Sequence, residues 1–352
     1  MNDNLYLTKT ICEKLADNHY LILATIISLQ GSSPRHGGTK MVVDQHSKSY
    51  GTIGGSLLEA TVIKEAGDAL SKRKSRLLSY DLTGENAYSK DMICGGSTRI
   101  LLDFISATKE NLEFFKAMHD AIAQGRNIFF LTMFKGQDQD VEVLGHTLYT
   151  LDGNTVGNYP WKEADLDMLK SEAKGLTATT ILASGDGSLI IDPIRKVETL
   201  FCFGAGHVAL STAHIAALAG FRVVVIDDRA EYANTERFPD ADEIHVIKDF
   251  NNAMDGLSID ADSYIVIFTH GHAYDRVVLQ QALQTNACYV GMISSKRKRE
   301  MIYKALMEQG VSNDALTFVH SPIGLNIGGE TPAEIAVSIV GELISERYKK
   351  KS

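Results

Sequence analysis

A glycine-rich turn between an apolar run and a helical pattern carries the clearest chemical signal in the chain. The run ETLFCF (198–203) leads into a Gly-x-Gly-x-x-Ala motif made of Gly204, Ala205, Gly206, His207, Val208 and Ala209. In such a motif the first glycine permits a tight turn, the second leaves room for a phosphate, and the alanine lets the helix pack closely on its strand. The amides and dipole of the helix N-terminus favour an anion, so the spacing predicts nucleotide-type binding at this turn.

An acidic pair follows at the end of the next strand pattern. FRVVVI (221–226) ends on Asp227 and Asp228, about 20 residues beyond the second glycine, where dinucleotide-binding folds place a carboxylate that accepts hydrogen bonds from a ribose diol. We expect Asp227 to take that role, with Arg229 as a further cofactor-binding residue. The alternative is a Rossmann-like scaffold whose crevice binds no nucleotide.

A third loop combines hydroxyl, imidazole and carboxylate groups. Thr269, His270, Gly271, His272 and Asp275 follow the strand pattern SYIVIF. We expect Thr269 to contact the cofactor and His270 and His272 to be the catalytic candidates, because imidazoles transfer protons near neutral pH. Metal ligation and a purely structural role remain open for the two histidines, and we predict no metal site.

A basic run opens the next helix pattern. Lys296, Arg297, Lys298 and Arg299 follow GMISS. Positive side chains beside free helix amides favour anions, so Lys296 is a further binding candidate. A solvated basic face is the alternative.

The first part of the chain contributes two more loops. Arg35 lies in GSSPRHGG, and Gly54 and Gly55 precede the helix that Ser56 and Glu59 begin as a capping box. These loops either expose backbone donors and an arginine to an anion or are simply tight turns. Cys94, in MICGGS, is either a reactive thiol, and hence a catalytic candidate, or an ordinary turn residue.

Composition places limits on the class of protein. The 352 residues are 44% hydrophobic and 22% charged, as in a globular protein, and the net charge of -9 argues against a nucleic-acid partner. No apolar run is long enough to span a membrane, and the first residues lack the pattern of a signal peptide, so we expect a cytoplasmic protein with no membrane partner. The four cysteines form no Cys-x-x-Cys pair, which predicts reduced thiols, with Cys202 and Cys288 in the core.

The pattern of elements predicts three parts. Residues 1–108 read as a small α+β domain, and residues 109–195 as a middle linker-subdomain in which we expect His146 and Trp161 to be structural. From residue 196 to 352 strands and helices alternate, including a last strand at TFVH (317–320) and a helix capped by Thr331 and Glu334. The fold class is therefore α/β, with a C-terminal Rossmann-like doubly wound parallel sheet and an N-terminal α+β domain.

Taken together, these motifs resemble the xanthine dehydrogenase accessory factor (XdhC/CoxI) family over most of the chain. The segments that carry the resemblance are GSSPRHGGTKMVV, GTIGGSLLEA, MICGGS, FGAGHVA, VVVIDDRAEYANTERFP, FTHGHAYDRVVLQQAL, YVGMISSKRKRE and PIGLNIGGETPAEIAVSIVGEL. The chain departs from the family pattern at Ser56 and Ser294, where glycine is common.

The resemblance implies a function in cofactor maturation. It implies binding of molybdenum cofactor (molybdopterin, possibly in its dinucleotide form), protection of it during sulfuration or selenation, and delivery to an apo-molybdenum hydroxylase of the xanthine dehydrogenase type. A cysteine desulfurase is the second implied partner. Such a protein is a chaperone more than a turnover enzyme, and a thiolate at Cys94 suits sulfur or molybdenum handling. We also expect a homodimer, because enclosing a large ligand calls for loops from both characteristic parts.

Two other functions fit the residues. The fingerprint, Asp227 and the nearby histidines would serve an NAD(H)-dependent oxidoreductase. A nucleotide-sensing regulatory module would need the fingerprint alone.

Overall fold

The chain forms two compact units, residues 2–196 and 197–352, here called the N-terminal and C-terminal units. The computed structural model describes residues 3–31, 37–54, 56–81, 96–136, 140–173, 175–185 and 187–349. Among these residues, no helix combines the length and apolarity needed to cross a bilayer.

A ten-stranded sheet runs through the whole N-terminal unit. Its strands are β1 (Leu21–Gly31), β2 (Lys40–Asp44), β3 (Ser49–Gly51), β4 (Ser75–Asp81), β5 (Gly96–Ile105), β6 (Ile128–Lys135), β7 (Asp140–Tyr149), β8 (Thr155–Gly157), β9 (Thr180–Ser184) and β10 (Gly187–Ile194). They pair in the order β3-β2-β1-β5-β4-β7-β6-β10-β9, with β8 beside β7. Strands of the predicted parts 1–108 and 109–195 meet where β4 pairs with β7, so both parts contribute to one sheet.

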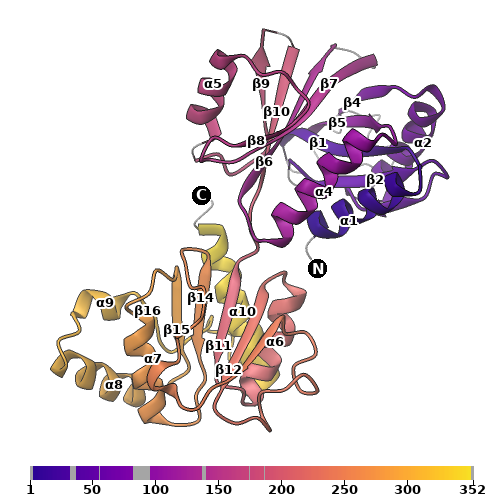
Figure 1. Ribbon diagram of the computed structural model, residues 1–352. Coiled ribbons are helices and arrows are strands. Elements are labelled where there is room, and N and C mark those ends of the chain that lie inside the picture. Colours follow the sequence, from indigo (N-terminus) through magenta and orange to yellow (C-terminus); the bar gives the residue numbers. More distant parts are fainter. Residues whose placement is uncertain are drawn as a thin grey trace. The chain divides into compact units, whose positions relative to one another are not determined.

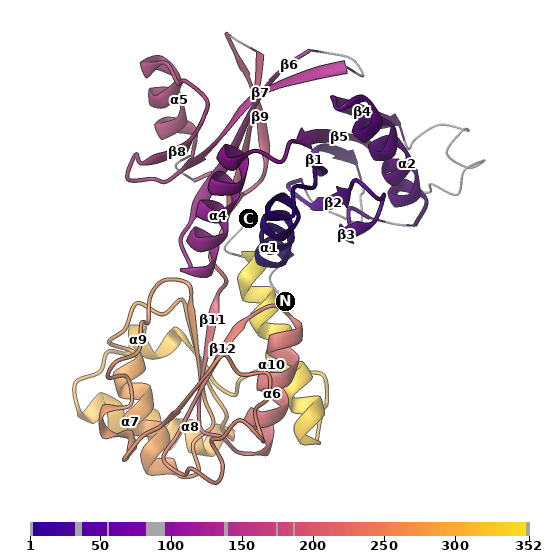
Figure 2. The same cartoon turned by 45° about the vertical axis from the view of Figure 1, so that its right-hand side comes forward.

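Helices cover this sheet according to the alternation of its apolar residues. They are α1 (Asp3–Ala16), α2 (Ser56–Lys72), α4 (Lys109–Ala123) and α5 (Glu163–Ala173). Ile22, Ala24 and Ile26 of β1 pack with α2, whereas Leu21 and Leu23, pointing the other way, join the cluster of α1 and α4. Figure 2 shows α1 and α4 lying side by side.

Lys40 and Asp192 form a charged pair that is enclosed in this unit. The side chains of Lys40 and Asp192 are only 4% and 5% exposed and form an ion pair. Lys40 also donates to the Gly38 carbonyl at 2.9 Å, and the Thr179 hydroxyl donates to Asp192 at 2.6 Å. Gly38 has a φ of +86°, and a Cβ there would lie 2.4 Å from both Asp192 and Thr179, so the pair depends on glycine at this turn.

The C-terminal unit is built on a six-stranded parallel sheet. Its strands are β11 (Thr199–Phe203), β12 (Arg222–Asp227), β13 (Glu243–Val246), β14 (Ser263–Ile267), β15 (Tyr289–Met292) and β16 (Val319–His320). The order β13-β12-β11-β14-β15-β16 is that of a Rossmann fold, with the chain reversing direction across the sheet between β11 and β14. This confirms the predicted doubly wound parallel sheet.

Helices lie on both faces of this sheet. They are α6 (His207–Leu218), η1 (Phe250–Asn252), α7 (His272–Ala282), α8 (Lys296–Glu308), α9 (Asn313–Thr317) and α10 (Pro332–Lys349). Leu200 and Cys202 of β11 pack on the side of α6 and α10, whereas Phe201 and Phe203 pack on the side of α7 and α8 (Figure 1). Cys202 is fully buried, so its predicted core position is confirmed.

The end of the unit differs from the sequence prediction at one strand. TFVH was expected to be a strand, but α9 runs through Thr317, and only Val319 and His320 pair with β15. Ser312 caps α9 by accepting from the Ala315 amide, so a local helix signal competed with the β-rich composition. The capping box before α10 is confirmed, because Thr331 and Glu334 exchange side-chain to backbone hydrogen bonds.

Removing one partner of the enclosed pair should destabilise the N-terminal unit. We expect Lys40→Met to lower its free energy of unfolding by about 3–5 kcal/mol, because Asp192 keeps a buried charge without its cation. Trp161 is the single tryptophan of the chain, and its indole donates to Thr147 at 2.9 Å, so its fluorescence in a urea titration reports on this unit. The double variant Lys40→Met/Asp192→Asn should recover more than half of the loss, whereas a wild-type midpoint for Lys40→Met would contradict the expectation.

Candidate functional site

Close packing of three strand ends requires glycine at position 204. Gly204 has a φ of +112°, and a Cβ there would lie 2.5 Å from the Phe268 carbonyl oxygen. Its amide donates to the Ile226 carbonyl at 2.7 Å. The turn after β11 is therefore fastened to the ends of β12 and β14, which brings the three loops predicted to carry chemistry to one edge of the sheet.

The second glycine of the motif has the opposite surroundings. Gly206 is the N-cap of α6, has a φ of -72°, and no side chain caps the helix. A Cβ placed on Gly206 would meet no atom within 4 Å. The first amides of a helix, here those of His207 and Val208, have no acceptor within the helix. The α6 N-terminus thus offers donors and a positive dipole end beside open space.

Asp227 lies inside this edge and organises it. Its side chain is 0% exposed and accepts four hydrogen bonds: from the Ala205 amide at 2.7 Å, from the Arg229 amide at 3.0 Å, and from the Arg229 guanidinium at 2.9 and 3.0 Å. Burial alone would raise the pKa of this carboxyl, but the Arg229 guanidinium and the two amides outweigh it and hold the pKa below its ordinary value. The predicted contact between Asp227 and a ribose stays a prediction. Both oxygens of this carboxylate already accept hydrogen bonds from the protein.

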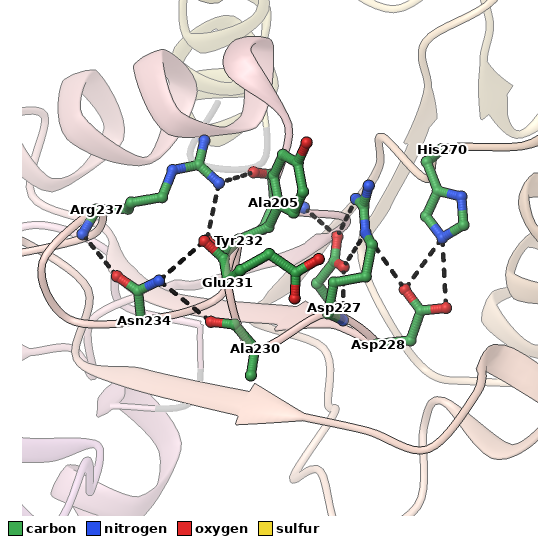
Figure 3. Close-up of polar contacts among 10 residues, drawn as sticks. Ala205, Asp227, Asp228, Ala230, Glu231, Tyr232, Asn234, Arg237 and His270 are labelled. Atoms are coloured by element: carbon green, nitrogen blue, oxygen red, sulfur yellow. Dashed lines mark hydrogen bonds and ion pairs between the residues drawn. The ribbon is translucent and has the colours of Figure 1, made fainter.

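The segment after β12 is held against the turn by a second arginine. The Arg237 guanidinium donates to the Ala205 carbonyl at 3.1 Å and to the Tyr232 carbonyl at 3.0 Å. The Tyr232 ring lies between two guanidinium groups, 4.0 Å from that of Arg229 and 4.8 Å from that of Arg237. The amide of Ala205 is therefore fixed by Asp227 at the end of β12, and its carbonyl by Arg237 from the segment that follows (Figure 3).

An imidazole and a carboxylate meet across the turn. His270 Nε2 lies 3.0 and 3.3 Å from the two carboxylate oxygens of Asp228, as Figure 3 shows. The side chains are 35% and 15% exposed, so a ligand can reach both. The His270 ring also packs edge-on against Tyr274 and Phe250, which limits its rotation. This pair comes from the ends of β12 and β14, on either side of β11, where ligands bind in such sheets.

Thr269 points inward and supports the start of α7. Its hydroxyl donates to Asp275 at 2.7 Å, and Asp275, which is fully buried, forms an ion pair with Lys298. Gly271 is the N-cap of α7, again without a side-chain cap. His272 begins the helix, but its side chain lies outside the described residues, so its catalytic role stays a prediction.

The basic run divides into two inward-facing and two exposed side chains. Lys298 pairs with Asp275, and Arg299 donates to the Ser321 carbonyl at 2.9 Å. Lys296 and Arg297 are exposed at the first turn of α8. Ser294, at the departure from the family pattern, shares a hydrogen bond of 2.6 Å with Ser321.

The candidates in the N-terminal unit are described only in part. Gly54 has a φ of +148°, and its amide donates to the Thr52 hydroxyl at 3.3 Å. Arg35, Gly55 and Cys94 lie outside the described residues, as does the side chain of Ser56, so their predicted roles stay predictions.

The thiols of the described cysteines form no disulfide, and burial raises the pKa of two of them. Burial raises the pKa of the Cys12 thiol to about 11 and that of Cys202 to about 12, so both are protonated near neutral pH. Within the described part of the chain, no group of three or more His, Cys, Asp or Glu side chains is placed to hold a metal ion.

Three residues of this edge were not singled out from the sequence. Asp228 was named only as the neighbour of Asp227, and Tyr232 and Arg237 lie in a segment without regular structure. A sharper interpretation of the repeated aspartates was possible, because consecutive residues at a strand end point in opposite directions. Asp227 would then point into the turn and Asp228 away from it.

Comparisons with known proteins agree with the fold. A model described as the XdhC Rossmann domain matches residues 200–343, and a model described as the XdhC and CoxI family matches residues 15–81. The chain belongs to the XdhC/CoxI family.

Relatives of this XdhC/CoxI chain extend over nearly its whole length. A probable xanthine dehydrogenase subunit of Bacillus subtilis is 26% identical, over 95% of this chain and 96% of the relative. A molybdenum cofactor insertion chaperone, PaoD of Escherichia coli, is 21% identical, over 99% and 91%. A crystal structure described as a xanthine dehydrogenase from Bacillus halodurans has a TM-score of 0.79 at 25% identity, over 99% of this chain and 96% of that one.

The contacts of Asp227 predict how this XdhC/CoxI site responds to substitution. We expect Asp227→Asn to destabilise the C-terminal unit by about 1.5–3 kcal/mol, because hydrogen bonds to a charged group are lost inside the protein. Hydrogen–deuterium exchange should increase at the Ala205 amide and through residues 228–237. Asp228→Asn changes the same charge one residue away and should leave this exchange unchanged, and equal exchange in both variants would contradict the role of Asp227.

The same carboxyl predicts a pH dependence. Its folded-state pKa is lowered, so its stabilisation is complete above the ordinary pKa of about 3.9 and is lost as the pH falls through the lower folded value. The stability difference between wild type and Asp227→Asn should therefore be constant from pH 7 to about pH 5 and shrink below about pH 4. Thermal unfolding followed by far-UV circular dichroism at each pH measures it.

Proposed function

We propose that this chain is a molybdenum-cofactor-binding accessory and maturation factor, which protects the cofactor during sulfuration or selenation and delivers it to a xanthine dehydrogenase-type molybdenum hydroxylase. The observation that carries the proposal is the uncapped α6 N-terminus at Gly206, open on the side of the missing Cβ, at the edge that also carries Asp228 and His270. The names of the relatives, an insertion chaperone and a xanthine dehydrogenase subunit, support the same assignment.

The donor set of the site fits the chemistry of this cofactor. Molybdopterin carries a phosphate, and its dinucleotide form carries a pyrophosphate, so the amides of Gly206, His207 and Val208 suit that end of the molecule. Arg229 is 28% exposed beside the turn, and Lys296 is exposed at the start of α8, so both offer positive charge to an anion. Asp228 is a partly exposed acceptor for the N–H groups of a pterin ring.

The work of the chain in this proposal is binding and release. The bound cofactor supplies the molybdenum chemistry that the recipient enzyme uses. In this proposal the residues of this chain carry out no step of that chemistry. Gly204, Asp227 and Arg237 hold the turn in one conformation, so the amides are oriented before the ligand arrives. His270, oriented by Asp228, offers a partly exposed imidazole for a hydrogen bond to the ligand.

Three partners follow from the proposed function. They are the apo-hydroxylase that receives the cofactor, a cysteine desulfurase that supplies sulfur, and a second copy of this chain. Pull-down of a molybdenum hydroxylase from a host that makes the cofactor tests the first, and capture of the desulfurase in the same experiment tests the second. Light scattering that gives the monomer mass at working concentration would contradict the homodimer.

An NAD(H)-dependent oxidoreductase is favoured less by the geometry. The carboxylate expected to bind the ribose, Asp227, is fully enclosed and accepts four internal hydrogen bonds. Calorimetry with NAD(H) separates the two functions, because saturable binding together with hydride transfer would favour the oxidoreductase.

Filling the open space at Gly206 should remove the cofactor and keep the fold. Gly206 has an ordinary φ, and a Cβ there meets no atom within 4 Å, so the side chain of Gly206→Val starts in the open space where the phosphate is expected. We expect bound pterin, measured per chain as its fluorescent oxidation product after expression in a cofactor-producing host, to fall at least about tenfold, which corresponds to 1.4 kcal/mol.

The control is the same substitution at a glycine that also has free space. Gly185 lies in a turn of the N-terminal unit, and a Cβ there meets nothing within 4 Å. Gly185→Val should retain the wild-type pterin content. Undiminished pterin in Gly206→Val, or wild-type protein with neither pterin nor a captured hydroxylase, would overturn the proposal.

A further inference from the structure

The N-terminal unit contains a polar cavity that the proposed function does not use. It has a volume of about 710 Å³, which is within the usual range for small-molecule sites. β4 pairs with both β5 and β7, and the cavity lies just beyond the first residue of β4, where no strand of the described residues joins the other two. A second space of about 170 Å³ adjoins it, because Asn111, His146 and Asn158 line both. These three side chains come from α4, β7 and the segment after β8.

A buried carboxylate orients the histidine at the centre. His146 Nε2 lies 2.7 Å from Asp103 Oδ2, and the two side chains are 8% and 3% exposed. The other oxygen, Asp103 Oδ1, is buried and has no partner among the described residues. A carboxylate accepts, so the His146 ring donates to Asp103 through Nε2, and in the neutral ring Nδ1 is the nitrogen left to accept.

Backbone contacts fix which way the two amides point. Asn158 Oδ1 accepts from the His146 amide at 3.0 Å, so its Nδ2 is left to donate. Asn111 Nδ2 donates to the Ser106 carbonyl at 2.9 Å, so its Oδ1 is left to accept. A backbone N–H and C=O have unambiguous roles, so neither amide can be flipped without losing a bond. The lining of the two spaces therefore includes one donor, on Asn158, and two acceptors, on Asn111 and the neutral His146 ring.

The charge and shape of the lining narrow the class of ligand. The larger space is lined by three acidic and three basic side chains, and the smaller one adds two glutamates. Lys135 is already paired with Glu142 at 2.9 Å, so an anion would find no net positive charge. Phe114 lines the smaller space and lies 5.8 Å from the His146 ring, which gives the site an aromatic surface.

We propose that this cavity binds a neutral bicyclic nitrogen heterocycle through its amide-like edge, with N–H groups on His146 and Asn111 and a carbonyl on Asn158. Purines and pterins share this chemistry. Such rings are planar, and the aromatic surface of Phe114 suits their faces. The inference does not rest on the proposed function, because all its residues lie in the N-terminal unit.

Calorimetry of the full chain with hypoxanthine and with pterin tests the site. The test variant is Asn158→Asp, which keeps the acceptor for the His146 amide and removes the donor. His146→Gln is the second variant, because its Nε2 can keep a donor to Asp103 while the remaining acceptor moves from the ring Nδ1 to the Gln Oε1. Asn313→Asp, an exposed residue of the C-terminal unit, makes the same charge change as a control.

We expect one of the two heterocycles to bind once per chain and both test variants to weaken it at least about tenfold, with the control unchanged. Trp161 fluorescence verifies that the N-terminal unit of each variant is folded, and far-UV circular dichroism verifies the fold of the control. Tighter binding of hypoxanthine identifies a purine as the source, and tighter binding of pterin identifies a pterin. Absence of binding for both at about 1 mM, or undiminished affinity in folded Asn158→Asp, would overturn the inference.

Discussion

The candidate site of the C-terminal unit depends on a single buried carboxylate. Asp227 accepts from the turn after β11 and from the segment after β12, so two loops that share no regular hydrogen bonding become one structure. A buried charge is costly unless it is fully hydrogen-bonded, and Asp227 meets this condition with four donors. The same bonds orient Ala205 and hence the glycine turn, so preorganisation of the site and stability of the unit have one physical cause.

Gly204 and Gly206, the two glycines of one motif, are subject to different physical constraints. At Gly204 the neighbouring strand leaves no room for a side chain, and the backbone adopts a left-handed φ. At Gly206 the backbone φ is ordinary and the space is free, so neither backbone conformation nor packing requires glycine there. A ligand that approaches the backbone, as in the proposed function, would account for the glycine. The distinction matters for function, because a substitution at position 206 tests binding and one at position 204 tests packing.

The sequence predicted those parts of the molecule that depend on local order. The parallel sheet, the turn at Gly204–Ala209 and the capping box at Thr331 follow from periodicity and from contacts within a few residues. The contacts between loops do not: His270 is 42 residues from Asp228, and Arg237 is 32 residues from Ala205. Such pairs are set by the tertiary arrangement of strands, and no spacing rule in the chain encodes them.

In the N-terminal unit, contacts join residues even farther apart in the sequence, which local patterns do not predict. Its strands pair across parts of the chain that were expected to be separate, and its enclosed ion pair joins residues 152 positions apart. His146 was expected to be structural, and its bond to Asp103 is compatible with that expectation. A purely structural histidine, however, does not require a cavity large enough for a small molecule, or two amides of fixed orientation in the lining that it shares. The proposed binding of a heterocycle would account for both features.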